Sequence, residues 1–266
     1  MNGIIIAAGL GSRMGIFTEA KPKCLLPIAG RTLLDHTIDQ LRSIGCTEII
    51  VVVGHKGEMI DVPNVRLVRN DDYENNNVLH SLMFAQVHLE GPVVVSYSDI
   101  WVEPWVFQRL SDTPGDIVLA VDQDWEPYYE GRTEHPISDA ENVFFDQSET
   151  VVSIGKHLVP AESQSNVCGE FLGLWRMSAS GSAKFKQNFE SLNSTLQYES
   201  PFQQAKQWQK AYITDMFQEL IDREEKLDCA VIERGWAELD TDQDYQRLTE
   251  IAERQRLITI YEANNK

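Results

Sequence analysis

Basic residues are scarce in this 266-residue sequence, which has 23 lysines and arginines against 41 aspartates and glutamates and a formal net charge of −18. A surface this acidic repels nucleic acids and anionic membranes, so neither is an expected partner. Long apolar runs are absent, and none approaches the roughly 20 residues of a membrane-spanning helix. The chain begins in an apolar stretch without the features of a signal peptide, so we expect a cytoplasmic protein.

Cysteine is rare too, and the four cysteines are far apart, at Cys24, Cys46, Cys168 and Cys229. No C-x-x-C pair is present, so a metal site or redox pair of that type is not expected. Reduced thiols are the simpler interpretation, as is usual in the cytosol. Internal repeats, low-complexity tracts and linkers are also missing, so we expect one domain over residues 1–266.

The most informative stretch is residues 3–27, G-I-I-I-A-A-G-L-G-S-R-M-G-I-F-T-E-A-K-P-K-C-L-L-P. Its apolar start, Ile4 to Ala8, has the length of one buried strand. The glycine turn that follows can approach a ligand closely and bind an anion through successive N–H groups. Three cations, Arg13, Lys21 and Lys23, then appear in an otherwise acidic chain. The glycine spacing fits neither a dinucleotide fingerprint nor a Walker A loop, but the combination indicates a triphosphate site.

Strand and helix patterns alternate along the chain. Two apolar runs, 4–8 and 48–53, flank a helical pattern at 33–44, and such a unit implies a parallel sheet. Further strands are expected at 65–68, 93–96, 117–121, 142–146, 150–154, 167–175 and 227–232, and further helices at 78–89, 105–110, 178–192, 212–221 and 242–260. The sequence predicts an α/β fold with a mostly parallel, mixed central sheet flanked by helices.

One acidic residue, Asp99, lies just past the strand pattern at 93–96. Ligands bind at the carboxyl ends of strands in open α/β sheets. A carboxylate there can hold Mg²⁺, which takes few protein carboxylates together with phosphate oxygens. The alternative is a turn-forming role, because aspartate is common after strands.

Two paired motifs carry a family resemblance. G-L-G-S-R at 9–13 followed by P-K-C-L-L-P at 22–27 resembles the signature of nucleoside-triphosphate transferases that activate small phosphorylated molecules, and E-L-D-T-D-Q-D at 238–244 is similar to a later segment of that family. The resemblance implies a Rossmann-like nucleotidyltransferase fold with Mg²⁺ on Asp99 and Asp240. It also implies that Arg13 and the glycine turn hold the β- and γ-phosphates, and that Lys23 lies on the α-phosphate.

The stretch N-D-D-Y-E-N-N-N-V-L-H-S-L at 70–82 is similar to a segment of bacterial phosphocholine cytidylyltransferases. This resemblance implies that Asn77 and Ser81 lie beside a pyrimidine base, although Asn77 could instead cap a helix. The expected nucleotide-binding residues are Ala7, Ala8, Gly9, Leu10, Gly11, Ser12, Asn77 and Ser81.

The acceptor half resembles a narrower group. Segments 124–136, 153–157 and 169–175 look like cytidylyltransferases associated with phosphoenolpyruvate mutase, which act on phosphonates such as 2-aminoethylphosphonate. Phosphocholine enzymes often have two acids at the first metal position, whereas here Ser98 precedes a single Asp99. Lys156 matches a lysine near the acceptor phosphate, with a surface lysine as the alternative.

An acceptor-binding insertion is expected at about 122–210. Trp125 matches a tryptophan that contacts the choline cation of phosphocholine enzymes, with core packing as the alternative. Nearby carboxylates, Asp124 and Glu126 among them, would complete an ammonium pocket, while two basic residues would contact a phosphonate or carboxylate. The expected acceptor-binding residues are Trp125, Arg132, His135, Glu170 and Asp215.

The resulting hypothesis is a Mg²⁺-dependent cytidylyltransferase that moves CMP from CTP to a small phosphonate or phosphate monoester. Lys23, Arg13 and Lys156 are the expected catalytic residues, and 2-aminoethylphosphonate is the preferred acceptor. Phosphocholine or another small phosphate ester, a sugar 1-phosphate, and a non-catalytic nucleotidyltransferase-like module remain as alternatives. A homodimer is left open.

Overall fold

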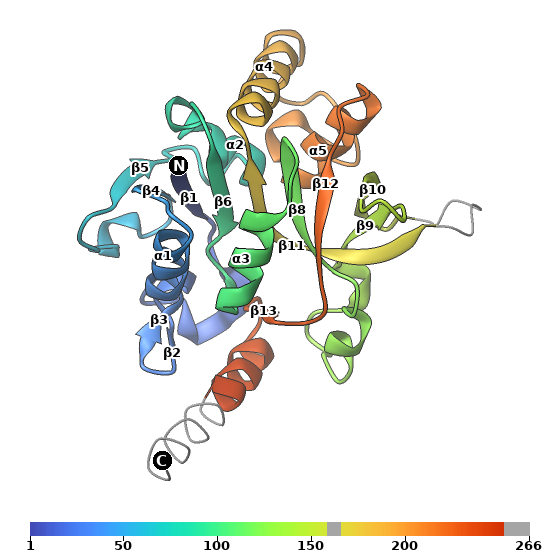
Figure 1. Ribbon diagram of the computed structural model, residues 1–266. Coiled ribbons are helices and arrows are strands. Elements are labelled where there is room, and N and C mark those ends of the chain that lie inside the picture. Colours follow the sequence, from blue (N-terminus) through green and yellow to red (C-terminus); the bar gives the residue numbers. More distant parts are fainter. Residues whose placement is uncertain (159–165, 253–266) are drawn as a thin grey trace.

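The computed structural model describes residues 1–158 and 166–252 and has the expected α/β fold (Figure 1). Within these residues a nine-stranded sheet runs in the order β10-β9-β11-β6-β1-β4-β5, and β8 joins it by pairing with β11 and β12. Its strands are β1 (Asn2–Ala7), β4 (Glu48–Val53), β5 (Arg66–Arg69), β6 (Val93–Tyr97), β8 (Ile117–Asp122), β9 (Glu141–Phe145), β10 (Val151–Lys156), β11 (Val167–Met177) and β12 (Asp228–Ile232).

The sheet is mixed, and most of its parallel pairs come from the N-terminal half. β1 pairs in parallel with β4 and β6, β4 pairs in parallel with β5, and β8 pairs in parallel with β12. β11 is antiparallel to β6, β8 and β9, and β9 is antiparallel to β10. The segment expected as an acceptor-binding insertion thus contributes strands to the same sheet, and β11 lies beside β6, the strand that leads to Asp99.

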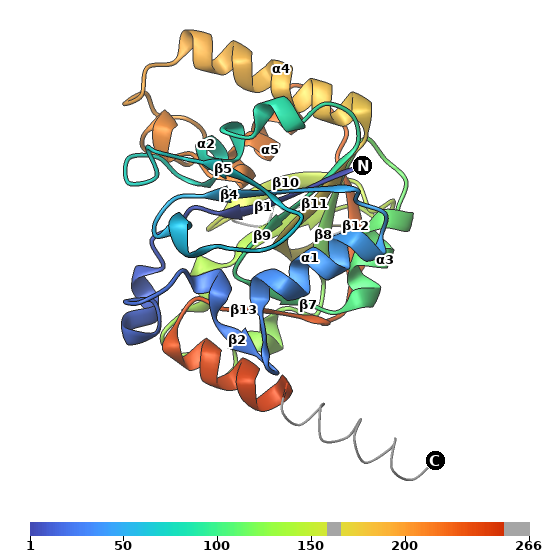
Figure 2. The ribbon, with the colours of Figure 1, turned by 90° about the vertical axis from the view of Figure 1, so that its left-hand side faces the viewer.

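Helices cover both faces of the sheet (Figure 2). α1 (Leu33–Ser43) and α3 (Pro104–Asp112) pack on one face, while α2 (Val78–Met83), α4 (Ala179–Thr195) and α5 (Ile213–Asp222) pack on the other. Alternate residues of β1 enter opposite cores, with Ile4 and Ile6 on one side and Ile5 and Ala7 on the other. Burial on both faces explains why the strand is a continuous apolar run.

Two short ladders lie outside the main sheet. β2 (Pro27–Ile28) pairs with β3 (Arg31–Thr32), and β7 (Ile100–Val102) pairs with β13 (Trp236–Glu238), both antiparallel. A third apolar cluster joins the N-terminal turn region to the last described helix through Met14, Leu26 and Leu248. These contacts bring the end of the chain next to the glycine turn.

The structure departs from the helix expected at 78–89, and it tests only the beginning of the last expected helix. The helix expected at 78–89 ends at Met83, because i to i+3 hydrogen bonds such as Ala85 N–H to the Leu82 carbonyl, 2.9 Å, replace the α-helical pattern and lead into a 3₁₀ turn at Gln86–His88. The last helix begins at Asp242 as expected, but its expected end near Ile260 lies outside the described residues. No helix in the described part of the chain combines the length and apolarity needed to span a membrane.

Candidate active site

Three distant segments meet at the carboxyl edge of the parallel strands. The glycine turn follows β1, and Asp99 follows β6, the parallel neighbour of β1. Asp240 follows β13, which pairs with β7 directly after Asp99. The Leu239 N–H donates to the Asp99 carbonyl at 2.7 Å. This late strand pairing therefore brings Asp240 to Asp99.

The Lys23 ammonium lies between these two carboxylates. Its Nζ is 2.7 Å from Asp99 Oδ2 and 2.6 Å from Asp240 Oδ1. Burial by itself would lower the pKa of Lys23, but the charges of Asp99 and Asp240 outweigh burial and raise it above its ordinary value. Lys23 is therefore protonated and neutralises both acids in the free protein.

The second oxygen of Asp240 faces two further basic groups. Arg13 Nη2 donates to Asp240 Oδ2 at 2.7 Å, and His135 Nδ1 lies 3.2 Å from the same oxygen. Burial would raise the pKa of Asp240, but Lys23, His135 and Arg13 together lower it well below its ordinary value. The expected phosphate-binding cations are thus paired with an expected metal ligand.

The residues at this point fit a divalent cation. Asp99 and Asp240 each place an oxygen within 2.7 Å of one cationic atom, Lys23 Nζ, so the pair already converges on a positive charge. Carboxylate oxygens are the ligands that Mg²⁺ takes, alongside phosphate oxygens. His135, Glu238 and Asp240 form a second group, with ligand atoms within 4.8 Å of one another.

A cavity of about 260 Å³ opens beside the ion pairs. The end where the nucleotide is expected, called the nucleotide end below, is formed by the glycine turn and by the start of α2. The expected residues found in its wall are Ala7, Ala8, Gly9, Gly11, Arg13, Lys23, Asn77 and Ser81. Leu10 and Ser12 are exposed and do not line it.

The glycines shape this turn. Gly11 has φ 64° and begins a 3₁₀ helix over Ser12–Phe17, and Gly15 within it has φ 45° and ψ −127°. Residues with a Cβ rarely adopt such angles. The two glycines let the chain reverse direction directly after β1.

Asn77 caps α2 at the nucleotide end. Its Oδ1 accepts from the Val78 N–H at 2.9 Å, and its Nδ2 donates to the Lys210 carbonyl at 3.1 Å. Both ends of this amide are therefore engaged in the free protein, and contact of Asn77 with a base remains a prediction. The neighbouring Asn76 also lines the cavity.

The other end of the cavity is acidic. Burial raises the pKa of Glu170 to about 8 and that of Glu141 to about 7, and burial together with the charge of Asp240 raises the pKa of Glu238 well above its ordinary value. Glu141 makes no side-chain hydrogen bond or salt bridge within the described residues, and Glu170 Oε2 is buried without a hydrogen-bond partner among them. The free protein thus keeps an excess of carboxyl groups here.

One expected cation, Lys156, reaches the acidic end. It ends β10, lines the cavity and holds its ammonium 4.9 Å from the Tyr212 ring centroid. Its backbone partner across the β9–β10 pair is Glu141. Attraction to Lys156 lowers the pKa of Glu141 but does not offset the burial of that carboxyl.

His135, Glu170 and Lys156 line the cavity, but three other expected acceptor residues do not. Trp125 is buried against Tyr129 and Ala140, in the core-packing role that the sequence had left open. The Asp215 carboxylate accepts from the N–H groups of Tyr212 and Gln204 at 2.8 and 3.0 Å and caps α5.

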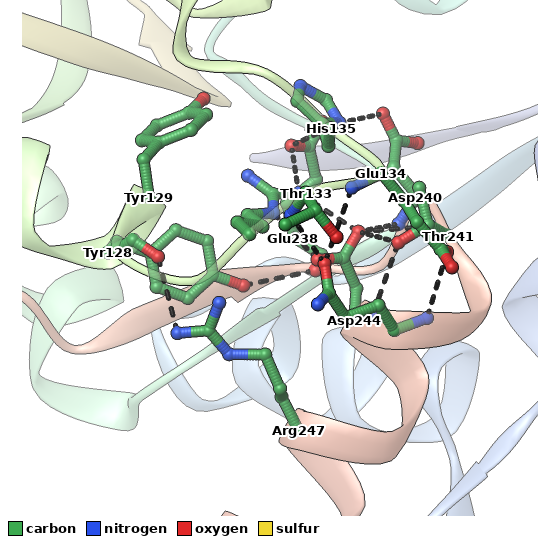
Figure 3. A network of polar contacts seen from close by, with 12 residues as sticks. Tyr128, Tyr129, Thr133, Glu134, His135, Glu238, Asp240, Thr241, Asp244 and Arg247 are labelled. Atoms are coloured by element: carbon green, nitrogen blue, oxygen red, sulfur yellow. Dashed lines mark hydrogen bonds and ion pairs between the residues drawn. The ribbon is translucent and has the colours of Figure 1, made fainter.

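Arg132 is the third residue that the structure keeps away from the cavity wall. Its fully buried side chain pairs with Asp244 at 2.6 Å and with Glu238 at 3.0 Å. Glu238 and Asp244 belong to the polar network shown in Figure 3. Its guanidinium also lies 4.9 Å from the Tyr128 ring centroid. These bonds tie the loop after η5 (Glu126–Tyr129) to the start of the last helix, so Arg132 orients Glu238.

Comparison with known proteins agrees with this arrangement. Residues 3–160, more than half of the chain, match the model of the MobA-like NTP transferase domain. The chain belongs to this family of nucleotidyltransferases.

Several members of the family are similar over most of the chain or over its N-terminal part. The CTP:phosphoglutamine cytidylyltransferase of Campylobacter jejuni is 25% identical over 253 residues, which cover 90% of this chain and 96% of that protein. The CMP-5'-(3-aminopropyl)phosphonate synthase of Streptomyces rubellomurinus is 33% identical over 135 residues, 48% of this chain and 22% of that protein. The choline-phosphate cytidylyltransferase of Streptococcus pneumoniae is 36% identical over 99 residues, 36% of this chain and 43% of that protein.

Solved structures of nucleotidyltransferases share the fold. The CTP:phosphocholine cytidylyltransferase from Streptococcus pneumoniae superposes with a TM-score of 0.70 at 23% identity, covering 94% of this chain and 98% of that chain. The inositol-1-phosphate CTP transferase from T. maritima gives a TM-score of 0.70 at 19% identity, covering 94% and 95%.

Sequence reasoning missed several cavity residues of this nucleotidyltransferase. Glu141 and Tyr97 lie just outside the strands expected at 142–146 and 93–96 and carried no expected role. Glu238 was expected at the solvent, and Tyr212 only as the start of a helix. The Tyr97 hydroxyl is buried without a hydrogen-bond partner within the described residues. A usable signal was present for Glu238, because it lies two positions before Asp240 in the family segment.

Proposed function

We propose that this enzyme transfers CMP from CTP to a small amine-bearing phosphonate, with 2-aminoethylphosphonate as the best candidate, and releases pyrophosphate. The observation that carries the proposal is the single cavity that joins the Lys23–Asp99–Asp240 cluster to the acidic wall of Glu141 and Glu170. A ligand ammonium would bring the cation that this wall lacks. The cytidylyl donor is supported by the printed activities of the three relatives, each of which names CTP, CMP or a cytidylyltransferase.

The reaction needs little covalent help from the protein. A phosphonate oxygen attacks the α-phosphorus, the new P–O bond forms, and the bond to the β-phosphate bridging oxygen breaks to release pyrophosphate. No general base is required, because the second ionisation of a phosphate-type group is near pH 6 and the attacking oxygen is already anionic. Catalysis therefore rests on positioning and charge neutralisation.

The chain's own residues divide this work. The glycine-turn N–H groups and Arg13 hold the terminal phosphates. Lys23 leaves the carboxylates of Asp99 and Asp240 and pairs with the α-phosphate oxygens. Lys156 attracts the anionic end of the acceptor, and the acidic wall attracts its amine. Asp99 and Asp240 would hold Mg²⁺, which supplies charge neutralisation of the phosphates when bound.

Phosphocholine is the second candidate acceptor. Aromatic rings of Tyr97, Tyr212 and Trp236 line the cavity, and a quaternary ammonium is attracted to aromatic faces. A sugar 1-phosphate carries no cation to balance Glu141 and Glu170 and is therefore disfavoured.

A pyrophosphate-release screen tests the proposal. CTP, UTP, ATP and GTP are each combined with 2-aminoethylphosphonate, 2-hydroxyethylphosphonate, propylphosphonate, phosphocholine and glucose 1-phosphate. We expect CTP with 2-aminoethylphosphonate to give the highest kcat/KM, with the amine-free phosphonates well below it. Equal rates for propylphosphonate and 2-aminoethylphosphonate would refute the amine requirement, and a better purine triphosphate would refute the cytidylyl donor.

A further inference from the structure

A buried polar network lies behind the nucleotide end of the cavity. Asn70 Nδ2 donates to Asn76 Oδ1 and to Ser81 Oγ, both at 2.9 Å, and Asn76 Nδ2 donates back to Asn70 Oδ1 at 3.1 Å. Asn76 and Ser81 line the cavity, whereas Asn70 is fully buried and does not. The three residues form a relay from the protein interior to the ligand space.

One backbone bond sets the direction of this relay. The Asp72 N–H donates to Asn70 Oδ1 at 3.0 Å. A backbone N–H can only donate, so the receiving atom must be the amide oxygen of Asn70. The amide nitrogen of Asn70 then points at Asn76 and Ser81, and the orientation of the Asn76 amide follows from its bond to Asn70 Oδ1.

Counting donors and acceptors leaves two open positions. Asn70 uses both hydrogens and both lone pairs of its amide within the network. The Ser81 hydroxyl accepts from Asn70 and donates to Asn76 Oδ1 at 3.3 Å. What remains is one N–H of Asn76 and one lone pair of Ser81 Oγ, and both belong to residues in the cavity wall.

The relay lies close to the β1 turn. A Cβ on Gly54 would be 2.6 Å from the Ala8 carbonyl oxygen and 2.8 Å from Tyr73 Cβ, so only glycine permits this approach of the 70–81 segment to Ala8. The segment that carries the relay therefore packs against Ala8, which lines the same cavity as Asn76 and Ser81.

We propose that this relay selects cytosine over uracil, with Ser81 Oγ accepting from the 4-amino group and Asn76 Nδ2 donating to N3. Asn70 touches no ligand and acts as a positioning residue that keeps the polarity of the other two. The inference rests on the proposed use of CTP and on Ser81, which the family resemblance already places beside the base. It adds Asn76 as a base contact and Asn70 as the residue that fixes the polarity of both. Uracil has the opposite polarity at both atoms, with an acceptor at O4 and a donor at N3–H, so it would meet Ser81 and Asn76 with mismatched groups.

The direct test pairs a side-chain deletion with a base deletion. Initial rates are measured for wild type and Ser81→Ala with CTP, UTP and the triphosphate of pyrimidin-2-one, which lacks the 4-amino group. Wild type should prefer CTP over the amine-free analogue, and Ser81→Ala should reduce that preference by about 10- to 100-fold, the range of a specific hydrogen-bonded base contact. An unchanged preference in Ser81→Ala would overturn the contact.

The positioning role of Asn70 has its own variant and control. In Asn70→Ala the Ser81 hydroxyl and the Asn76 amide can rotate, so the CTP to UTP ratio of kcat/KM should fall by about 10-fold or more. The matched control is Asn75→Ala, an exposed asparagine of the same segment that does not line the cavity. A ratio that stays at the wild-type value in Asn70→Ala overturns the relay, since general loosening of the fold would lower both rates together.

The outcomes separate this inference from the proposed function. If the wild type turns over CTP, and both Ser81→Ala and Asn70→Ala keep the base preference of the wild type, then only the relay is refuted. If the wild type prefers UTP or a purine triphosphate, both the CTP assignment and the relay are refuted. If Asn70→Ala does not fold by circular dichroism, the Ser81→Ala comparison decides.

Discussion

The two ends of the cavity differ in how the free protein satisfies their charges. At the nucleotide end, Lys23 is bonded to Asp99 and Asp240, and Arg13 is bonded to Asp240. At the acceptor end, Glu141 has no salt bridge within the described residues, and Glu170 keeps a buried oxygen without a partner there. The first end is balanced internally, while the second has surplus acid.

This contrast indicates what each end needs from its ligand. At the nucleotide end a triphosphate must compete with carboxylates for Lys23 and Arg13, so binding exchanges one set of ion pairs for another. At the acceptor end a cation can bind without displacing any protein cation. The donor site is therefore expected to depend on metal and phosphate together, and the acceptor site on the charge of the amine.

The largest expected effect comes from removing Lys23. Lys23→Ala deletes the cation assigned to the α-phosphate, and loss of one such electrostatic contact lowers turnover by about 10²- to 10³-fold. Pyrophosphate release measures it, with circular dichroism to show that the fold survives. Lys21→Ala is the matched control, because Lys21 is close in sequence but does not line the cavity. Near-normal turnover of Lys23→Ala would refute the role.

The acceptor end should respond next. Glu170→Gln and Glu141→Gln keep the shape of each side chain but cannot ionise to pair with a bound amine, so KM for 2-aminoethylphosphonate should rise by about 10-fold, while KM for propylphosphonate stays within about twofold. Steady-state kinetics with both acceptors measure this. Glu130→Gln, an exposed acid that does not line this cavity, is the control. Equal changes for both acceptors would mean that these carboxyls do not contact the amine.

Lys23 also offers a test that needs no turnover. Lys23→Ala leaves Asp99 and Asp240 without their shared cation, while Arg13 stays bonded to Asp240, so Mn²⁺ no longer competes with the ammonium and its affinity without nucleotide should increase by about 10-fold. Electron paramagnetic resonance of free Mn²⁺ measures this affinity, with Lys21→Ala as the control. Weaker Mn²⁺ binding by Lys23→Ala would argue that the two acids are not the metal site.

The surplus acid predicts a pH dependence of stability. Burial raises the pKa of Glu170 from 4.5 to about 8, so the folded protein holds a proton that the unfolded chain releases. The stabilisation from protonated Glu170 is complete below about pH 4.5 and is lost as the pH rises through 8. Glu170→Gln should make the free energy of unfolding fall less steeply between pH 5 and 8, by up to about 1.4 kcal/mol per pH unit.

Urea unfolding of wild type, Glu170→Gln and Glu130→Gln at several pH values measures this difference. Glu141 and Glu238 keep their own raised pKa values, so some slope should remain in Glu170→Gln. Parallel profiles for wild type and Glu170→Gln would contradict the raised pKa.

The smallest effect is expected at Trp125. Its ring packs against Tyr129 outside the cavity wall, so Trp125→Phe should change KM for the acceptor by no more than about twofold and act mainly on stability. A tenfold rise in acceptor KM, without a change in KM for CTP, would place Trp125 in the acceptor site after all.

The comparison of the two ends also explains which features could be predicted. The nucleotide end depends on residues 3–27, where strand, glycine turn and cations follow one another, and local spacing is enough to propose a triphosphate site there. Helix and strand positions were predictable for the same reason, since burial of β1 on both faces leaves a continuous apolar run. The expected helix at 78–89 was too long because hydrogen bonds after Met83 do not show in an apolar period.

The residues of the acceptor end could not be predicted from local spacing in the sequence. Glu141, Glu170 and Glu238 lie in β9, β11 and β13, and they share a cavity only because those strands pair in a particular register with β10, β8 and β7. A shift of one residue would turn each side chain to the other face. Trp125, Arg132 and Asp215 have suitable chemistry for an acceptor site, but they serve the fold instead. Trp125 packs in an apolar cluster, Arg132 joins an ion-pair network, and Asp215 caps a helix.

Residues 3–27 thus predict a triphosphate site through short-range order alone: an apolar strand, a turn that only glycine adopts readily, and cations at fixed distances along the chain. The meeting of Asp240 with Asp99, the acidic wall and the direction of the Asn70 relay come from contacts between segments far apart in sequence. Such contacts depend on strand register and on single backbone hydrogen bonds, for which residue type and spacing carry almost no signal.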